Sequence, residues 1–277
     1  MALEPIAAHW AAPSQLFVIR LNSHMKKTVY KYITELAAES KSRLTRHFAD
    51  EVEEFSFLLG KTVTILQNYN KSNAPTSDKT PKSEAYNIML KGTNALMAGF
   101  ELVTGGYLWE PPILFRNALE GFASAWDIVH NPKRFDLWEK EKKFNSTASI
   151  SNLKKAIEPV GQMYGFLSNM YTHFSPINAT PPLIESDGMP KPQFFGQIPV
   201  GKENIRVGEV YFALMVAYIC LQLTELTFHQ YSPELETIEK IPGKDFVKVK
   251  VSERHRKYVN ASMKHFQAMI DDPESFI

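Results

Sequence analysis

Hydrophobic side chains recur every three or four residues along most of the chain, which is the spacing of one face of an α-helix. The stretches 14–39 and 43–70 both keep this spacing. In the second stretch the apolar stripe consists of Leu44, Phe48, Val52, Phe55, Leu59, Val63 and Leu66. Residues 70–83 then lack large apolar side chains and are rich in turn formers. The pattern predicts long N-terminal helices over 1–70 and a mobile loop over 71–83.

Four further helices are predicted between residues 83 and 231. They cover about 83–103, 112–130, the stretch from 159 to Ser175-Pro176, and 204–231. The clearest follows Pro112, a residue suited to the first turn of a helix, and ends at Asn131-Pro132. Its apolar seam is Phe115, Leu119, Phe122, Trp126 and Val129. These helices predict a core helical bundle over 84–231, with a core that includes Phe115, Leu119, Phe122, Trp126, Leu167, Tyr171, Leu214 and Tyr218.

Residues 175–204 interrupt this bundle with six prolines and the apolar pair Phe194-Phe195. A stretch of this length without helical pattern is uncommon in a compact domain, so it is a lid, a partner-binding excursion or disordered. Two adjacent aromatic side chains on a solvated linker would expose a large apolar area, so the segment 175–204 is predicted to pack over the mouth of the bundle.

Residues 232–277 form a C-terminal extension. Its sequence "DFVKVKV", 245–251, alternates as a short strand does, and 252–270 read as a terminal helix. The fold class is therefore all-α: a helical bundle with a long Pro-rich excursion and a short C-terminal strand plus helix.

Length and charge narrow the classes of function. The 277 residues suit one principal domain, and 31 Lys and Arg against 30 Asp and Glu create no global field that would attract a polyanion. A nucleic-acid site would therefore be local. The single cysteine, Cys220, has no internal partner, which indicates a reducing compartment and a cytoplasmic protein.

Two apolar stretches are candidate membrane segments. The first 19 residues carry Glu4 and Pro5 where a secretory signal carries positive charge, so no signal peptide is expected. The run 210–226 becomes polar at Gln222, short of the roughly 20 apolar residues that a bilayer requires. It is expected to be a buried core helix, with no membrane partner.

The common cofactor motifs are absent from the sequence. There is no glycine-rich phosphate loop, dinucleotide fingerprint, Cys-x-x-Cys, HExxH or Gly-x-Ser-x-Gly motif. Asp127-x-x-His130 and Glu225-x-x-x-His229 do not match the Glu-x-x-His pairs of a di-iron bundle. Neither a cofactor nor a metal site is expected.

Two helices carry polar groups that could form a site. Arg116 and Glu120 lie one position beyond the seam of the 112–130 helix, where they form either a local salt bridge or part of a cleft. His173 stands in the last turn of the helix that begins near Pro159, where a cation is stabilised by the helix dipole. The polar side of that helix, Ser168, Asn169, Thr172 and His173, lacks the Lys and Glu of a solvated face, which favours a ligand-binding cleft.

The segments "LFRNALEGFASAWDIVHNP", 114–132, and "YGFLSNMYTHFSP", 164–176, resemble an uncharacterised all-helical bacterial family related to HEPN domains. Arg116, Glu120, Asn131-Pro132, Ser168 and His173 carry the resemblance, which covers roughly 84–230. It implies a homo-oligomer that binds a nucleotide or RNA phosphate in bacterial defence or stress response. In that case Arg116 would bind the phosphate, Glu120 would orient a neighbour, and His173 would act as general acid or base.

The chain departs from the active ribonuclease branch of that family, in which an Arg and a His stand four to six residues apart on one helix. The sequence contains no such pair. Catalysis is therefore left open. If the site is formed, His173 should lie within reach of Arg116 or Glu120.

The alternative is a non-catalytic protein-protein interaction module. Its surfaces would be Phe194-Phe195, the terminal strand or the loop over 71–83. A basic C-terminal region could also contact a protein or nucleic acid, although a solvated helix face explains it as well. This region comprises Lys244, Lys248, Lys250, Arg254, His255, Arg256, Lys257 and Lys264, with Phe246 and Tyr258.

Overall fold

A computed structural model describes residues 37–73, 79–107, 110–140, 144–155, 157–171, 183–186, 189–192, 200–201, 203–230, 238–240 and 247–249, with single residues at 31, 35 and between 260 and 271. This part of the chain contains eight α-helices. They are α2 (Ala37–His47), α3 (Ala49–Ser72), α4 (Pro81–Thr104), α5 (Glu110–His130), α6 (Pro132–Lys140), α7 (Ser146–Leu153), α8 (Glu158–Tyr171) and α10 (Val207–Phe228).

The remaining described elements are short. A 3-10 turn, η2 (Glu203–Arg206), leads into α10. The strands β1 (Leu183–Ser186) and β2 (Met189–Pro192) pair antiparallel, as do β3 (Ile238–Lys240) and β4 (Val247–Val249). The predicted all-helical class is confirmed. The finer prediction of a bundle with an excursion, a terminal strand and a terminal helix stays a prediction, because most of 172–199 and 250–277 lies outside the described residues.

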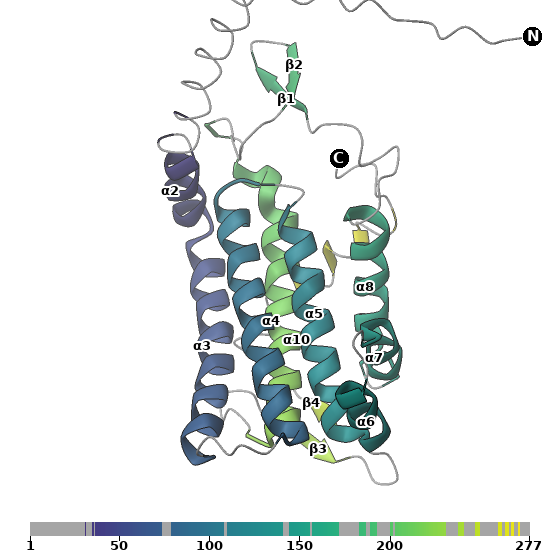
Figure 1. Cartoon of the computed structure of the whole chain (residues 1–277). Coiled ribbons are helices and arrows are strands. Elements are labelled where there is room, and N and C mark those ends of the chain that lie inside the picture. The colour runs from purple at the N-terminus through teal and green to yellow at the C-terminus, as the bar shows by residue number, and fades with distance from the viewer. Residues whose placement is uncertain are drawn as a thin grey trace, which may run out of the picture.

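The long helices α3, α4, α5 and α10 lie side by side, and α6, α7 and α8 lie along the outer side of α5 (Figure 1). Helix α10 packs against α3, α4 and α5, so it is enclosed. Apolar side chains lie on every side of this helix, and nearly all of its residues are buried, as expected of a helix without a solvated face. By length and composition alone this helix could cross a membrane, but 83% of its most apolar window is buried inside the protein. That burial agrees with the predicted core helix.

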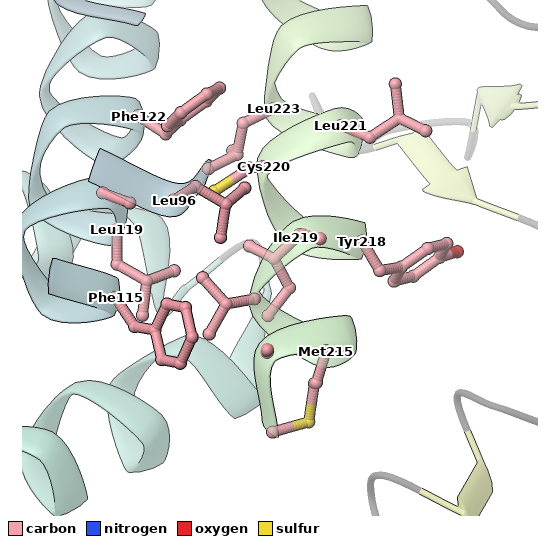
Figure 2. Packing of buried hydrophobic residues seen from close by; sticks show 14 of the residues in the cluster. Leu96, Phe115, Leu119, Phe122, Met215, Tyr218, Ile219, Cys220, Leu221 and Leu223 are labelled. Atoms are coloured by element: carbon pink, nitrogen blue, oxygen red, sulfur yellow. The ribbon is translucent and has the colours of Figure 1, made fainter. Parts of the chain in front are cut away.

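The core forms where α5 meets α10. Figure 2 shows Phe115 and Leu119 pointing toward α10, while Tyr218 and Leu221 point to the opposite side of α10. Of the eight core residues predicted from the sequence, six are buried: Phe115, Leu119, Phe122, Leu167, Leu214 and Tyr218. Trp126 is only partly buried, and the side chain of Tyr171 lies outside the described part.

Helices α4 and α5 approach each other closely because two glycines of α4 face phenylalanine rings of α5. A Cβ atom at Gly92 would lie 2.8 Å from Cε2 of Phe122, and one at Gly99 would lie 2.6 Å from Cε1 of Phe115. Atoms of real side chains do not come so near, so a larger residue at either position requires the rings to move. The sequence "KGTNALMAGF" thus fixes the separation of these two helices.

The stretch 43–70, whose helical spacing predicts one continuous helix, is interrupted in the structure. The chain leaves the helix at Phe48, which separates α2 from α3. After this break Phe55 and Leu66 of the predicted stripe are buried, but Leu58 and Ile65 are buried in place of the predicted Leu59 and Val63, which are only half-buried. A break shifts the following helix about its axis, so a periodicity read across the break assigns the buried stripe only in part.

Two short helices were not predicted from the sequence. Pro132, interpreted as the end of one helix, is also the first residue of α6, a position where its missing N–H is not needed. Helix α7 begins after Asn145, whose side chain accepts a hydrogen bond from the backbone N–H of Ala148. Both signals were present in the sequence, but these helices span only about two turns, and periodicity is weak over that length.

Candidate functional site

Arg116 and Glu120 are brought together one turn apart on α5. Nε of Arg116 donates to Oε1 of Glu120 at 3.0 Å. The hydroxyl of Tyr164, on α8, lies between them: it accepts from Nη2 of Arg116 at 3.0 Å and donates to Oε1 of Glu120 at 2.8 Å. Ser146, at the start of α7, donates to Oε2 of Glu120 at 3.1 Å. The four side chains therefore form one hydrogen-bonded cluster at the junction of α5, α7 and α8.

The Arg116 guanidinium is held in place but remains accessible. It lies over the ring of Tyr164, with Cζ 5.1 Å from the ring centroid, a cation–π arrangement. Burial alone would lower its pKa, but the hydrogen bond with Tyr164 and the charge of Glu120 outweigh burial, so the pKa of Arg116 is raised above its usual value. The side chains of Arg116 and Glu120 keep 22% and 23% of their exposure. This site is neither fully closed nor fully solvated.

The hydrogen bonds of Arg116 use only part of its donor capacity. A guanidinium carries five N–H donors in a fixed plane. Among the described residues, its partners take protons from Nε and Nη2, and none takes one from Nη1. One edge of the guanidinium is thus left for water or a ligand.

The predicted residues on α8 are only partly described. Ser168 is half-buried on the same helix as Tyr164. Asn169 belongs to α8, but its side chain lies outside the described part, as do Thr172 and His173 altogether. The expected approach of His173 to Arg116 or Glu120 therefore stays a prediction. The expected packing of Phe194 and Phe195 over the helices falls outside the described residues as well.

Sequence reasoning missed two members of the cluster, Tyr164 and Ser146. By its spacing Tyr164 belongs to the apolar seam of its helix, with Leu167 and Tyr171, and Tyr164 is buried in the structure. A buried tyrosine hydroxyl usually finds a hydrogen-bond partner, so a polar group opposite this seam could have been expected. Ser146 carries no signal of its own in the sequence beyond its place directly after Asn145, the cap of a short helix.

A second polar cluster joins α5 to α6 and α7. The carboxylate of Asp127, 2% exposed, accepts from Nε of Arg134 at 2.8 Å, from Oγ of Ser149 at 2.8 Å and from Nδ2 of Asn152 at 3.0 Å. Nη2 of Arg134 also donates to the carbonyl oxygen of Asn145 at 2.8 Å. The carboxylate is enclosed and fully hydrogen-bonded, which indicates a structural role rather than a ligand site.

The described part of the chain offers no group of His, Cys, Asp and Glu side chains able to hold a metal ion. The two histidines weighed in the sequence lie near each other, with the ring centroids of His130 and His229 6.4 Å apart. Nδ1 of His130 lies 2.8 Å from the carbonyl oxygen of Trp126, in hydrogen-bonding distance. His130 is thus tied to its own helix.

Comparison with known proteins gives no match: no family model, no curated protein and no solved structure is significantly similar to this chain. The relation to HEPN domains, expected from short motifs, is therefore not shown.

Proposed function

We propose that the chain is a HEPN-like helical protein that binds the phosphate of a nucleotide or RNA through Arg116, in bacterial defence or stress response. The proposal includes a homo-oligomeric state and a cytoplasmic location, both of which rest on the sequence alone. The observation that carries it is the state of Arg116: its plane is fixed by Glu120 and Tyr164, while the edge at Nη1 remains available.

Fixing the guanidinium favours phosphate binding in two ways. A free arginine loses side-chain entropy when it binds, whereas Arg116 is already held by two hydrogen bonds and a ring contact. Its planar fork also matches the geometry of phosphate oxygens better than a lysine does. The site is therefore preorganised on the protein side.

Glu120 has the opposite effect on an incoming anion. Its carboxylate neutralises part of the charge of Arg116 and would repel a phosphate. Ser146 and Tyr164 both donate to this carboxylate and so disperse its charge. This opposition yields a test, because a purely structural cluster and a phosphate site respond differently to loss of the carboxylate.

The test measures binding of fluorescent oligouridine and of ATP by fluorescence anisotropy and calorimetry. Arg116→Gln should weaken binding by about 10- to 100-fold, the usual worth of a charge-assisted hydrogen bond. Glu120→Gln should tighten binding because it removes the competing negative charge, and it should also lower thermal stability. Arg46→Gln, an exposed arginine on α2, is the matched control and should change neither quantity appreciably.

Equal binding by Arg116→Gln and the unmodified protein would contradict the proposal. The result would favour the alternative, a non-catalytic interaction module. One observation supports that alternative: Leu90 and Met97, two turns apart on one side of α4, are 41% and 52% exposed. Large apolar side chains that gather on an uncovered helix face are typical of protein interfaces.

A further inference from the structure

A groove of about 320 Å³ lies between α4 and α5, on a different side of α5 from the Arg116 cluster. Its floor is made by small or compact residues, Ile88, Gly92 and Ala95 of α4 and Gly121 of α5. The indole of Trp138, on α6, forms part of its wall. Gly92 and Gly121 add no side chains to this lining, which leaves room for a ligand above them.

The wall at Trp138 is preformed. Nε1 of Trp138 donates to Oε2 of Glu84 at 3.1 Å, which ties α6 to α4. The ring of Phe144 packs edge-on against the indole, with centroids 5.2 Å apart. The indole therefore offers a fixed aromatic surface and needs no rearrangement to receive a ligand.

Three polar side chains line the same groove with free capacity. Lys91, Asn87 and Asn117 are all exposed, and none has a hydrogen-bond or ion-pair partner among the residues that the structure describes. Glu84, in contrast, is engaged by Trp138. Lys91 follows Glu84 by seven residues, or about 10 Å along the helix. The groove is thus cationic at Lys91 and carries its carboxylate near the indole.

We propose that this groove binds a planar aromatic anion. The aromatic body lies on the floor of Gly92, Ala95 and Gly121 against the indole of Trp138, and the anionic group pairs with Lys91. The volume lies in the range of small-molecule sites, and an apolar lining with a few polar groups is their usual composition. The amides of Asn87 and Asn117 supply hydrogen bonds to the edge of the ligand.

The charge pattern selects an anion over a cation. The ammonium of Lys91 is uncommitted among the described residues, whereas the carboxylate of Glu84 already accepts a hydrogen bond. A cationic ligand beside Lys91 would be repelled, and the carboxylate of Glu84 that could offset this repulsion lies about 10 Å away along the helix. A ligand with an N–H donor at its far end would gain a second contact, at Glu84.

The probe for this site is naphthalene-2-sulfonate, a planar aromatic anion whose binding is measured by calorimetry. Its neutral analogue without the sulfonate measures the contribution of the charge. Ala95→Phe fills the groove and should abolish binding of both probes. Lys91→Gln should weaken binding of the sulfonate about three- to fivefold, as for a partly exposed ion pair, and leave binding of the neutral analogue unchanged.

Matched controls separate this site from others. Lys71→Gln, an exposed lysine of α3, and Arg116→Gln should leave both probes unaffected, so this test and the phosphate test can fail independently. The indole N–H signal that Trp138→Phe removes from the nuclear magnetic resonance spectrum should shift when the sulfonate is added.

The proposal is overturned if Ala95→Phe folds, judged by thermal unfolding, and still binds the sulfonate as the unmodified protein does. It is also overturned if the Trp138 signal stays in place, or if Lys91→Gln weakens both probes equally. A groove occupied by a second copy of the chain would give a fourth contrary result: the unmodified protein would be an oligomer that Ala95→Phe dissociates, and the probe would not bind that oligomer.

Discussion

The Asp127 cluster allows the sharpest stability prediction. Replacing Asp127 with Ala removes three hydrogen bonds at once, from Arg134, Ser149 and Asn152. It also leaves the guanidinium of Arg134, whose side chain is 12% exposed, without its carboxylate. Breaking a buried ion pair by removal of one partner costs about 3–5 kcal/mol.

The expected loss lies near the lower end of this range, at about 3 kcal/mol, because Arg134 keeps other contacts. Its Nη2 still donates to the carbonyl of Asn145, and its Cζ lies 4.2 Å from the ring centroid of Phe144. Domains are usually stable by about 5–15 kcal/mol, so the variant should still fold but unfold at lower denaturant concentration. Urea unfolding followed by circular dichroism measures the change. The slope of the unfolding free energy against urea concentration should stay the same, which shows that the midpoint shift reports stability.

Two further variants test whether Asp127 and Arg134 form a buried and coupled ion pair. Asp136→Ala, at an exposed aspartate of α6, should change stability by no more than about 0.5 kcal/mol. The double variant Asp127→Leu with Arg134→Met removes both charges and should be more stable than Asp127→Ala alone. A loss below about 1 kcal/mol for Asp127→Ala, or a double variant less stable than the single one, would refute a buried and coupled ion pair.

Two further predictions concern packing and pH. Gly99→Ala should lower the free energy of unfolding by about 1–3 kcal/mol, because its Cβ would meet the buried ring of Phe115. Gly60→Ala, whose Cβ would have no atom within 4 Å, should raise it by up to about 1 kcal/mol through helix propensity. Similar urea midpoints for the two variants would contradict the close approach of α4 and α5. Burial, together with the nearby His229, lowers the pKa of His130, so the unfolded chain binds more protons as the pH falls through about 6.5 and stability should fall with it. His130→Gln should reduce this pH dependence of the unfolding midpoint, and an identical dependence in both proteins would speak against the lowered pKa.

In the candidate site, the sequence predicts the contact within one helix but not the contact between two helices. Arg116 and Glu120 could be paired from the sequence because residues four apart on a helix are neighbours wherever the helix lies. Their partner Tyr164 comes from a helix 44 residues further along the chain than Glu120, and the hydroxyl that joins them follows from how α5 and α8 pack. No spacing rule predicts a contact of that kind.

The sequence by itself determined the helical class, the approximate extent of α4, α5, α8 and α10, and most of the core, because period and apolar content depend only on residues close in the chain. Only the tertiary structure decided which polar groups meet. Asp127 appeared in the sequence as a weak metal candidate, but Arg134, Ser149 and Asn152 enclose it once α6 and α7 fold back along α5. The groove at Trp138 likewise exists only because α6 brings the indole to Glu84 of α4, 54 residues away in sequence. Contacts over such separations depend on helix packing, which hydrophobic periodicity constrains without specifying.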